Sequence, residues 1–231
     1  MKVAVLGTGS VGQALAGKLL ALNHSVYIGT RDPEQTRAKT EKDAFGNPPI
    51  GLWLKAHPTA HLLSFKEAVT QGSDLLFFAM NGQHALTCLA TIGEALLADR
   101  LLIDISNPLD FSQGFPPNLF VSNTDSLGEQ IQAAYPQTKV VKTLNTMSNP
   151  VMVNPTALKG HHTVFVSGND ADAKAEVTEV LKSFGWLDQQ ILDLGDISTA
   201  RGTEMLLPIW LRLYGKFQTP YFNFSINTQQ Q

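Results

Sequence analysis

The stretch that decides the fold is KVAVLGTGSVG, residues 2–12. Its first part, residues 2–6, is a short apolar run typical of a buried strand. The run ends at the glycine-rich segment GTGSVG, residues 7–12. Apolar side chains then recur at helical spacing through residues 11–22. The order strand, glycine-rich turn, helix predicts a Rossmann-type unit at the N-terminus.

Each glycine of residues 7–12 has a mechanical role in such a unit. Gly7 makes the tight turn, Gly9 lets a pyrophosphate approach the backbone, and Gly12 lets the helix pack close to the strand. Phosphate then binds unpaired amides at the positive end of the helix. The alternative is that the glycines only build a tight corner between strand and helix. The amides that we expect to donate to phosphate are those of Thr8, Gly9, Ser10 and Val11.

The next strand, residues 25–29, indicates which dinucleotide binds. A site that prefers NAD carries an acid at this strand end, which binds the ribose 2′-hydroxyl. Here the strand is followed by Thr30 and Arg31. A guanidinium pairs with phosphate in a planar fork, so this end of the strand favours NADP(H). The alternative for Arg31 is a solvated loop residue, and Asp32 with Pro33 is typical of a helix N-cap.

Strand and helix patterns alternate along the rest of the chain, which predicts an α/β protein with a Rossmann-type, doubly wound, mainly parallel sheet and a small C-terminal helical segment. We expect a dinucleotide-binding domain at 1–150 and a smaller C-terminal part at 151–231 that continues the sheet. Residues 110–124 are expected to form a loop. The expected strands are 2–6, 25–29, 61–63, 74–80, 101–105, 139–144, 162–167 and 191–194. The main expected helices are 11–22, 65–70, 83–97, 126–134, 171–184 and 199–214.

Composition excludes several classes of protein. The chain has 231 residues, a formal charge of −3 and no cluster of basic residues, so we expect no nucleic-acid partner. The single cysteine, Cys88, cannot form an internal disulfide or a cysteine-based zinc site. No stretch approaches the roughly 20 apolar residues of a membrane span. We find no signal peptide and expect a cytoplasmic protein.

The sequence offers no set of catalytic or metal-ligating residues. Tyr135 and Lys139 have the spacing of the proton relay in short-chain dehydrogenases, but Pro136 prevents the helix that the relay needs. No histidine pairs with an acid at metal-ligand spacing, so we predict no metal site. The absence of an acid–base or nucleophilic pair favours hydride transfer between two ring cofactors, because that reaction depends on alignment more than on a proton donor. We therefore assign no catalytic residue.

Several segments together resemble the NADPH-dependent reductases of the deazaflavin coenzyme F420. The resemblance covers nearly the whole chain, and the module is also similar to the cytosolic oxidoreductase domain of membrane metalloreductases. The segments that carry it are residues 7–12, Asn23-His24, Gly29-Thr30-Arg31, His84-Ala85, KVVKTLNT at 139–146, and Ser198, Arg201 and Glu204 ahead of Leu206-Leu207-Pro208.

The resemblance implies a cofactor site along one crevice. Residues 8–11 would hold the pyrophosphate, and Thr30 and Arg31 the 2′-phosphate. His84 also follows the strand 74–80, a position that borders the crevice of a doubly wound sheet, although a helix histidine without function is an equal alternative. We add Asn107, which follows the strand 101–105, to the predicted cofactor-binding residues. The residues that would lie along the cofactor or approach the nicotinamide are Met80, Asn81, His84, Asn145, Thr146 and Met147.

Two departures leave the second substrate open. The archaeal enzymes have Pro-Trp where this chain has Asn81-Gly82, and they lack the insert that contains residues 47–50 and Trp53. We predict an oxidoreductase that moves hydride between NADP(H) and coenzyme F420 or a flavin such as FMN. The alternatives are an NADPH-dependent reductase of a small carbonyl or imine, and a sensor that binds NADP(H) without turnover.

The C-terminal segment is too apolar for a solvated tail. Residues 205–214 are followed by Phe217, Tyr221, Phe222 and Phe224. Large exposed apolar patches mark interfaces, and the resemblance implies a dimer, so we predict a homodimer through this segment. The alternative is that the segment packs on its own sheet. Pro208 predicts a kink within the helical pattern.

Overall fold

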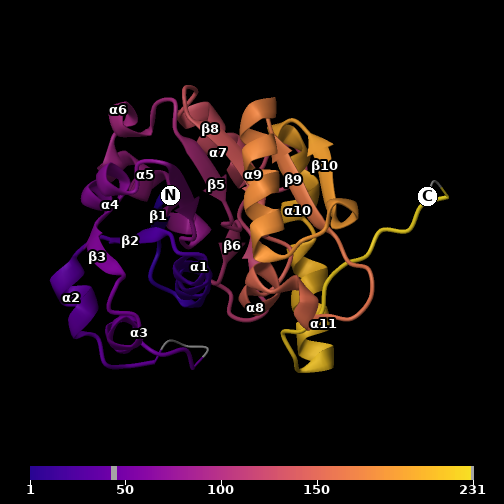
Figure 1. The fold of residues 1–231 in the computed structure, drawn as a ribbon. Helices are drawn as coiled ribbons and strands as arrows, with labels where there is room; N and C mark the ends of the chain where they lie inside the picture. Colours follow the sequence, from indigo (N-terminus) through magenta and orange to yellow (C-terminus); the bar gives the residue numbers. More distant parts are fainter. Residues whose placement is uncertain (43–45, 230–231) are drawn as a thin grey trace.

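The structure is a computed structural model that describes residues 1–42 and 46–229 (Figure 1). Within these residues, eight strands form one sheet and two short strands form a separate hairpin. The sheet contains β1 (Lys2–Leu6), β2 (Ser25–Thr30), β3 (His61–Ser64), β4 (Leu75–Phe78), β5 (Leu101–Asp104), β8 (Lys139–Thr143), β9 (Val164–Gly168) and β10 (Ile191–Gly195). The hairpin is β6 (Leu109–Asp110) with β7 (Asn118–Leu119).

The strand order is β10-β9-β8-β5-β4-β1-β2-β3. All neighbours pair in parallel except β8 and β9, which are antiparallel. The predicted mainly parallel, doubly wound sheet is therefore confirmed. The chain runs outward from β1 to β3 and returns to β4 on the other side of β1. This reversal opens a crevice at the carboxyl ends of β1 and β4, where α/β proteins bind ligands.

Helices cover both faces of the sheet, so there are two apolar cores. Val3 and Val5 of β1 belong to one core and Ala4 and Leu6 to the other, because successive strand residues point to opposite faces. The first core includes residues of α1, α8 and α9, and the second includes residues of α4, α5, α7 and α10. The helices are α1 (Ser10–Ala21), α2 (Pro33–Ala38), α3 (Ile50–Ala56), α4 (Phe65–Gln71), α5 (Ala85–Ile92), α6 (Glu94–Leu97), α7 (Leu127–Ala134), α8 (Asn149–Val153), α9 (Ala171–Phe184), α10 (Ala200–Glu204) and α11 (Leu207–Phe217).

Figure 1 places β3 with α2 and α3 at one edge of the sheet, and β10 with the C-terminal segment at the other edge. Strands β9 and β10 extend the same sheet past residue 150. None of the helices in the described part of the chain is long and apolar enough to cross a membrane.

Residues at two helix ends have the geometry that their residue types favour. Asn23 has a φ of 62°, the left-handed conformation that asparagine tolerates after a helix. Asp32 caps α2, since its Oδ1 accepts a hydrogen bond of 3.0 Å from the amide of Gln35, and Pro33 occupies the first turn.

Three predicted elements were wrong in detail. The helix expected over 83–97 breaks at Gly93, which has a φ of 94° and separates α5 from α6. The loop expected over 110–124 contains the hairpin β6–β7. The single helix expected over 199–214 is two helices, and Pro208 lies in the first turn of α11, where its missing amide N–H costs nothing.

Candidate dinucleotide site

The glycines of the loop after β1 (residues 7–12) differ in what a side chain would meet. Gly7 has a φ of 128°, and a Cβ there would collide with the carbonyl of Ala79. A Cβ on Gly12 would collide with the carbonyl of Gly7. A Cβ on Gly9 would have no atom within 4 Å. Gly7 and Gly12 are thus needed to build the turn, whereas Gly9 faces open space that a ligand can fill.

That open space lies at the N-terminus of α1. The amide of Gln13 donates to the carbonyl of Gly9 at 2.9 Å, which leaves the amides ahead of it without helical partners. No side chain caps this end and no acid lies in the first turn. The helix therefore presents free amides and a positive dipole end, which suits a phosphate group.

Two cavities meet at Gly9. The first, which we call the loop-side cavity, lies between the glycine-rich loop and residues 38–42 and 48–50, and has a volume of about 600 Å3. The second, the strand-end cavity, lies beside the segments that follow β4 and β5 and has a volume of about 340 Å3. Gly9 lines both, so the glycine-rich loop joins them. A dinucleotide has two nucleoside halves joined by a pyrophosphate, which matches this arrangement. The loop-side cavity is lined by Thr8, Gly9, Gln13, Thr36, Ala38, Lys39, Thr40, Glu41, Lys42, Pro48, Pro49 and Ile50. The strand-end cavity is lined by Gly9, Ser10, Val11, Ala79, Met80, Asn81, Gly82, Ile105, Ser106, Asn107, Leu109 and Phe111.

The two residues predicted to bind the 2′-phosphate lie differently. Thr30 is buried, and its hydroxyl lies 2.9 Å from the hydroxyl of Thr36. Arg31 is exposed, and its guanidinium has no hydrogen bond or ion pair with any residue that the structure describes. Arg31 is therefore available to an external anion, while Thr30 helps to hold α2 against the end of β2.

The residues predicted along the nicotinamide half fall into two groups. Met80, Asn81 and Asn107 line the strand-end cavity. His84 is exposed in the 3-10 turn Gly82–His84 and lines neither of the two cavities.

Residues 145–147 are buried, and Asn145 contacts Asn107, which lines that cavity. The side-chain amide of Asn145 donates to Oδ1 of Asn107 at 3.0 Å, and Nδ2 of Asn107 donates to the carbonyl of Asn145 at 3.0 Å. Thr146 and Met147 are buried and line neither cavity. The C-terminal segment passes over this turn, since the Ser148 hydroxyl donates to the carbonyl of Pro220.

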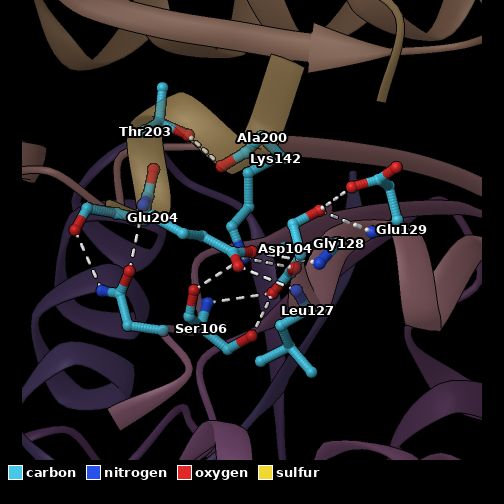
Figure 2. Close-up of polar contacts among 12 residues, drawn as sticks. Asp104, Ser106, Leu127, Gly128, Glu129, Lys142, Ala200, Thr203 and Glu204 are labelled. Carbon is cyan, nitrogen blue, oxygen red and sulfur yellow. Dashed lines mark hydrogen bonds and ion pairs between the residues drawn. The ribbon is translucent and has the colours of Figure 1, made fainter. Parts of the chain in front are cut away.

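Sequence reasoning missed three features of the site. Gln13 is buried and its Nε2 donates to the carbonyls of Thr8 and Pro48, at 2.9 and 3.1 Å, which ties the insert to the glycine-rich loop. Phe111 reaches the strand-end cavity from the hairpin. Lys142 is fully buried in β8 beside Asp104 and Glu204 (Figure 2). A lysine within the apolar strand 139–144 was the available signal for the last of these.

Cys88 does not supply a nucleophile to the site. Burial raises the pKa of Cys88 to about 12, so its thiolate is not available near neutral pH. Among the described residues, no three His, Cys, Asp or Glu side chains lie close enough together to hold a metal ion.

The doubly wound sheet, the glycine-rich loop and the paired cavities define a Rossmann-type dinucleotide-binding protein. The family model for NADP oxidoreductase, coenzyme F420-dependent, matches residues 2–108. A crystal structure from Arthrobacter sp. FB24, provisionally named an F420-dependent NADP-reductase, is 52% identical and superposes with a TM-score of 0.91 over 99% of this chain and 100% of that one. The chain belongs to this family and is an NADP-dependent oxidoreductase.

More distant relatives share parts of the same architecture. Metalloreductase STEAP3 of Rattus norvegicus is 27% identical over 90% of this chain, which spans only 38% of that protein's length. A reductive aminase from Aspergillus terreus in complex with NADPH and ethyl levulinate is 19% identical and superposes with a TM-score of 0.62, over 94% of this chain and 62% of that one. At that identity the likeness shows the fold alone.

Proposed function

We propose that this protein transfers hydride between NADP(H) and a planar ring acceptor, either coenzyme F420 or a flavin such as FMN. Membership of the family supports this proposal, as do the residues that line the strand-end cavity. NADPH, when bound, supplies a hydride from its nicotinamide ring. The hydride carries two electrons and leaves NADP+, and the acceptor ring takes a proton from solvent.

The two halves of the dinucleotide are assigned to the two cavities. The pyrophosphate binds the amides at the start of α1, next to Gly9, and the 2′-phosphate binds Arg31. The nicotinamide half enters the strand-end cavity, beside Met80 and Asn107. Under this proposal residues 1–150 hold the cofactor. The part from residue 151 onward covers the turn at residues 145–148 and supplies an interface between subunits.

The observation that carries the proposed acceptor class is the lining of the strand-end cavity. Within the described chain, none of the residues that line it is ionisable, and Val11, Met80, Ile105, Leu109 and Phe111 make much of it apolar. Reduction of a carbonyl or an imine needs a proton donor near the reacting atom. Transfer between two stacked rings needs alignment and exclusion of water, which an apolar, aromatic wall provides.

The test is NADPH oxidation followed by absorbance, with F420, FMN and a panel of small ketones and imines as separate acceptors. We expect turnover with at least one ring acceptor, a strong preference for NADPH over NADH, and no turnover with the small carbonyl and imine panel. Turnover of the panel alone would instead support the small-molecule reductase. Tight NADPH binding with no oxidation by any acceptor would support a sensor.

We propose further that the protein is a homodimer through the C-terminal segment. Helix α11 and the segment after it leave large apolar side chains exposed, namely Ile209, Tyr214, Phe217 and Tyr221. Such a patch is typical of an interface. Light scattering at micromolar concentration should give about twice the chain mass, and Ile209→Asp with Phe217→Asp should halve it. A monomeric wild-type protein would contradict the proposed dimer.

A further inference from the structure

A charged cluster adjoins the strand-end cavity through Ser106, on the face of the sheet covered by α7 and α10. Nζ of Lys142 donates to three oxygens, each at 2.7 Å: Oδ2 of Asp104, the carbonyl of Ser106 and Oε1 of Glu204. Figure 2 shows these side chains converging between the strand and the short helix that carries Glu204. All three donor positions of the ammonium are therefore used.

The cluster joins four elements that are distant in the sequence. Asp104 ends β5, Lys142 lies in β8, and Glu204 ends α10. The carboxylate of Glu204 also accepts the amides of Leu127 and Gly128, at 2.8 and 3.0 Å, at the N-terminus of α7. Glu204 thus satisfies free amides of that helix and pairs with the ammonium at the same time.

A buried ion pair of this kind is weak evidence for a gain in stability. Burying an ion pair costs solvation free energy that the attraction between the charges often fails to recover. Burial by itself would lower the pKa of Lys142. The negative charges and hydrogen bonds of Asp104 and Glu204 outweigh this effect and hold the pKa above its ordinary value. The lysine therefore remains charged, and its three hydrogen bonds fix the relative positions of Asp104, Ser106 and Glu204.

The cluster fixes the geometry of the two segments that follow β5 and β8, which contain Asn107 and Asn145. Oδ1 of Asp104 accepts the amide and the hydroxyl of Ser106, at 2.9 and 2.6 Å, which sets the direction of the chain into Asn107. After β8 the chain passes through Leu144, whose φ of 61° is a strained, left-handed conformation for a leucine. Asn107 and Asn145 then clamp each other through the two hydrogen bonds described above.

This clamp leaves half of the Asn107 amide unused. An asparagine amide offers two N–H donors and two acceptor positions. The bonds to Asn145 use one of each, and the structure gives the side chain no other partner among the described residues. One donor and one acceptor remain on a side chain that lines the strand-end cavity. A nicotinamide carboxamide carries the complementary acceptor and donor.

We propose that Asn107 binds the carboxamide of the nicotinamide ring, and that Lys142, with Asp104 and Glu204, positions Asn107 without contacting the dinucleotide. This inference rests on the proposed binding of the nicotinamide half in the strand-end cavity. Asn107 selects nicotinamide rings that carry an intact carboxamide, and Asn145 keeps the amide from rotating.

The test compares three ligands by calorimetry: NADPH, its 3-acetylpyridine analogue, which has a methyl group in place of the carboxamide nitrogen, and 2′,5′-ADP, which has no nicotinamide. In Asn107→Ala we expect NADPH to bind about tenfold more weakly, the effect of two lost hydrogen bonds. The variant should also lose the wild-type preference for NADPH over the analogue. Affinity for 2′,5′-ADP should stay within about twofold.

The positioning role is tested with the double variant Asp104→Asn, Lys142→Met. Removing Asp104 and Lys142 together avoids an unpaired ammonium, and the remaining Glu204 carboxylate keeps its hydrogen bonds from the amides of Leu127 and Gly128. We expect the same loss of preference for the carboxamide, again with 2′,5′-ADP unaffected. The control is Arg201→Met, since Arg201 also joins α10 to α7, through Glu129 at 2.8 Å, but does not touch Asp104 or Ser106. It should keep the wild-type preference even if its melting temperature falls.

Three results separate the possible failures. Equal weakening of NADPH and 2′,5′-ADP in the double variant would show a merely structural role and overturn the positioning claim. Unchanged preference in Asn107→Ala would overturn carboxamide recognition by Asn107. A wild-type protein that binds 2′,5′-ADP but gains nothing from the nicotinamide would overturn the proposed use of the strand-end cavity itself.

Discussion

The carbonyl oxygen of Gly7 occupies the place that a side chain on Gly12 would need, whereas the space beside Gly9 is empty. Packing of the backbone therefore requires glycine at position 12, whereas at position 9 the fold itself would accept a side chain. Gly12→Val should destabilise the fold by roughly 1–3 kcal/mol or more, since the backbone of the turn has to move. Gly9 has a φ of −74°, which valine adopts freely, so Gly9→Val should lose at most about 1 kcal/mol from the weaker cap.

The two variants should separate folding from binding. Gly9→Val should keep its melting temperature within a few degrees of the wild type and lose NADPH and NADH binding together, because its side chain fills the space assigned to the pyrophosphate. Thermal unfolding and calorimetry on the same samples measure both effects. Tight NADPH binding by folded Gly9→Val would contradict the assigned phosphate site.

Arg31 should determine the preference for NADPH over NADH. Its guanidinium is exposed and free of partners among the described residues. A hydrogen bond to a charged group contributes roughly 1.5–3 kcal/mol, so Arg31→Ala should weaken NADPH about tenfold or more. NADH, which lacks the 2′-phosphate, should bind as before. Calorimetric titration with both dinucleotides measures the difference.

Arg37 offers a matched control, because it is also an exposed arginine and, like Arg31, lines neither of the two cavities, but it lies in the last turn of α2 and not at the end of β2. Arg37→Ala should leave both affinities unchanged. An equal loss for NADPH and NADH in Arg31→Ala would mean that the arginine supports the loop and does not read the phosphate.

The sequence predicted the parts of this molecule that depend on local patterns. The strand, turn and helix of residues 2–22 follow from apolar periodicity and from glycines, and both act over a few residues. The break at Gly93 was missed because a single glycine inside an apolar helical pattern is often tolerated.

The buried cluster could not be predicted in the same way. Lys142, Asp104 and Glu204 come from three distant segments, and only the pairing of β5 with β8 and the packing of α10 on α7 bring them together. The sequence offered one signal, a lysine within an apolar strand. Its partners depend on tertiary contacts, which local periodicity does not contain.

Phe111 should contribute to binding of the ring acceptor. It extends from the hairpin β6–β7, and Gln83 fixes the base of that hairpin by donating to Asp110 at 3.2 Å. Stacking against an aromatic side chain contributes roughly 0.5–1.5 kcal/mol beyond the buried area. Phe111→Ala should therefore raise KM for the acceptor about two- to tenfold. The dissociation constant for NADPH should change little, and steady-state kinetics with calorimetry measure both.

Phe115 lies on the same hairpin loop, is 60% exposed and lines neither of the two cavities. Phe115→Ala should leave both constants unchanged. If Phe111→Ala and Phe115→Ala raised KM for the acceptor equally, the hairpin would only cover the site, and Phe111 would not stack on the acceptor.

His162 anchors the C-terminal segment in a way that depends on its charge. The ring is buried, and its Nε2 lies 3.1 Å from the carbonyl of Pro155, to which only an N–H can donate. Nδ1 of the neutral ring therefore accepts from Nδ2 of Asn223, at 3.1 Å. Beside this contact, the amide of Thr163 donates to the carbonyl of Phe224 at 2.9 Å.

Burial lowers the pKa of His162 below its ordinary value of 6.5. The unfolded segment therefore takes up a proton at a higher pH than the folded one, so stability falls as the pH drops below 6.5 and is unaffected above it. Hydrogen exchange at the Thr163 amide, corrected for its intrinsic rate, should show this loss of protection between pH 7.5 and 5. His162→Gln, which does not titrate, should flatten the dependence, and His161→Gln, at the exposed neighbour, should not. A dependence that survives in His162→Gln would assign the effect to another group and leave His162 as a packing residue beside Trp186.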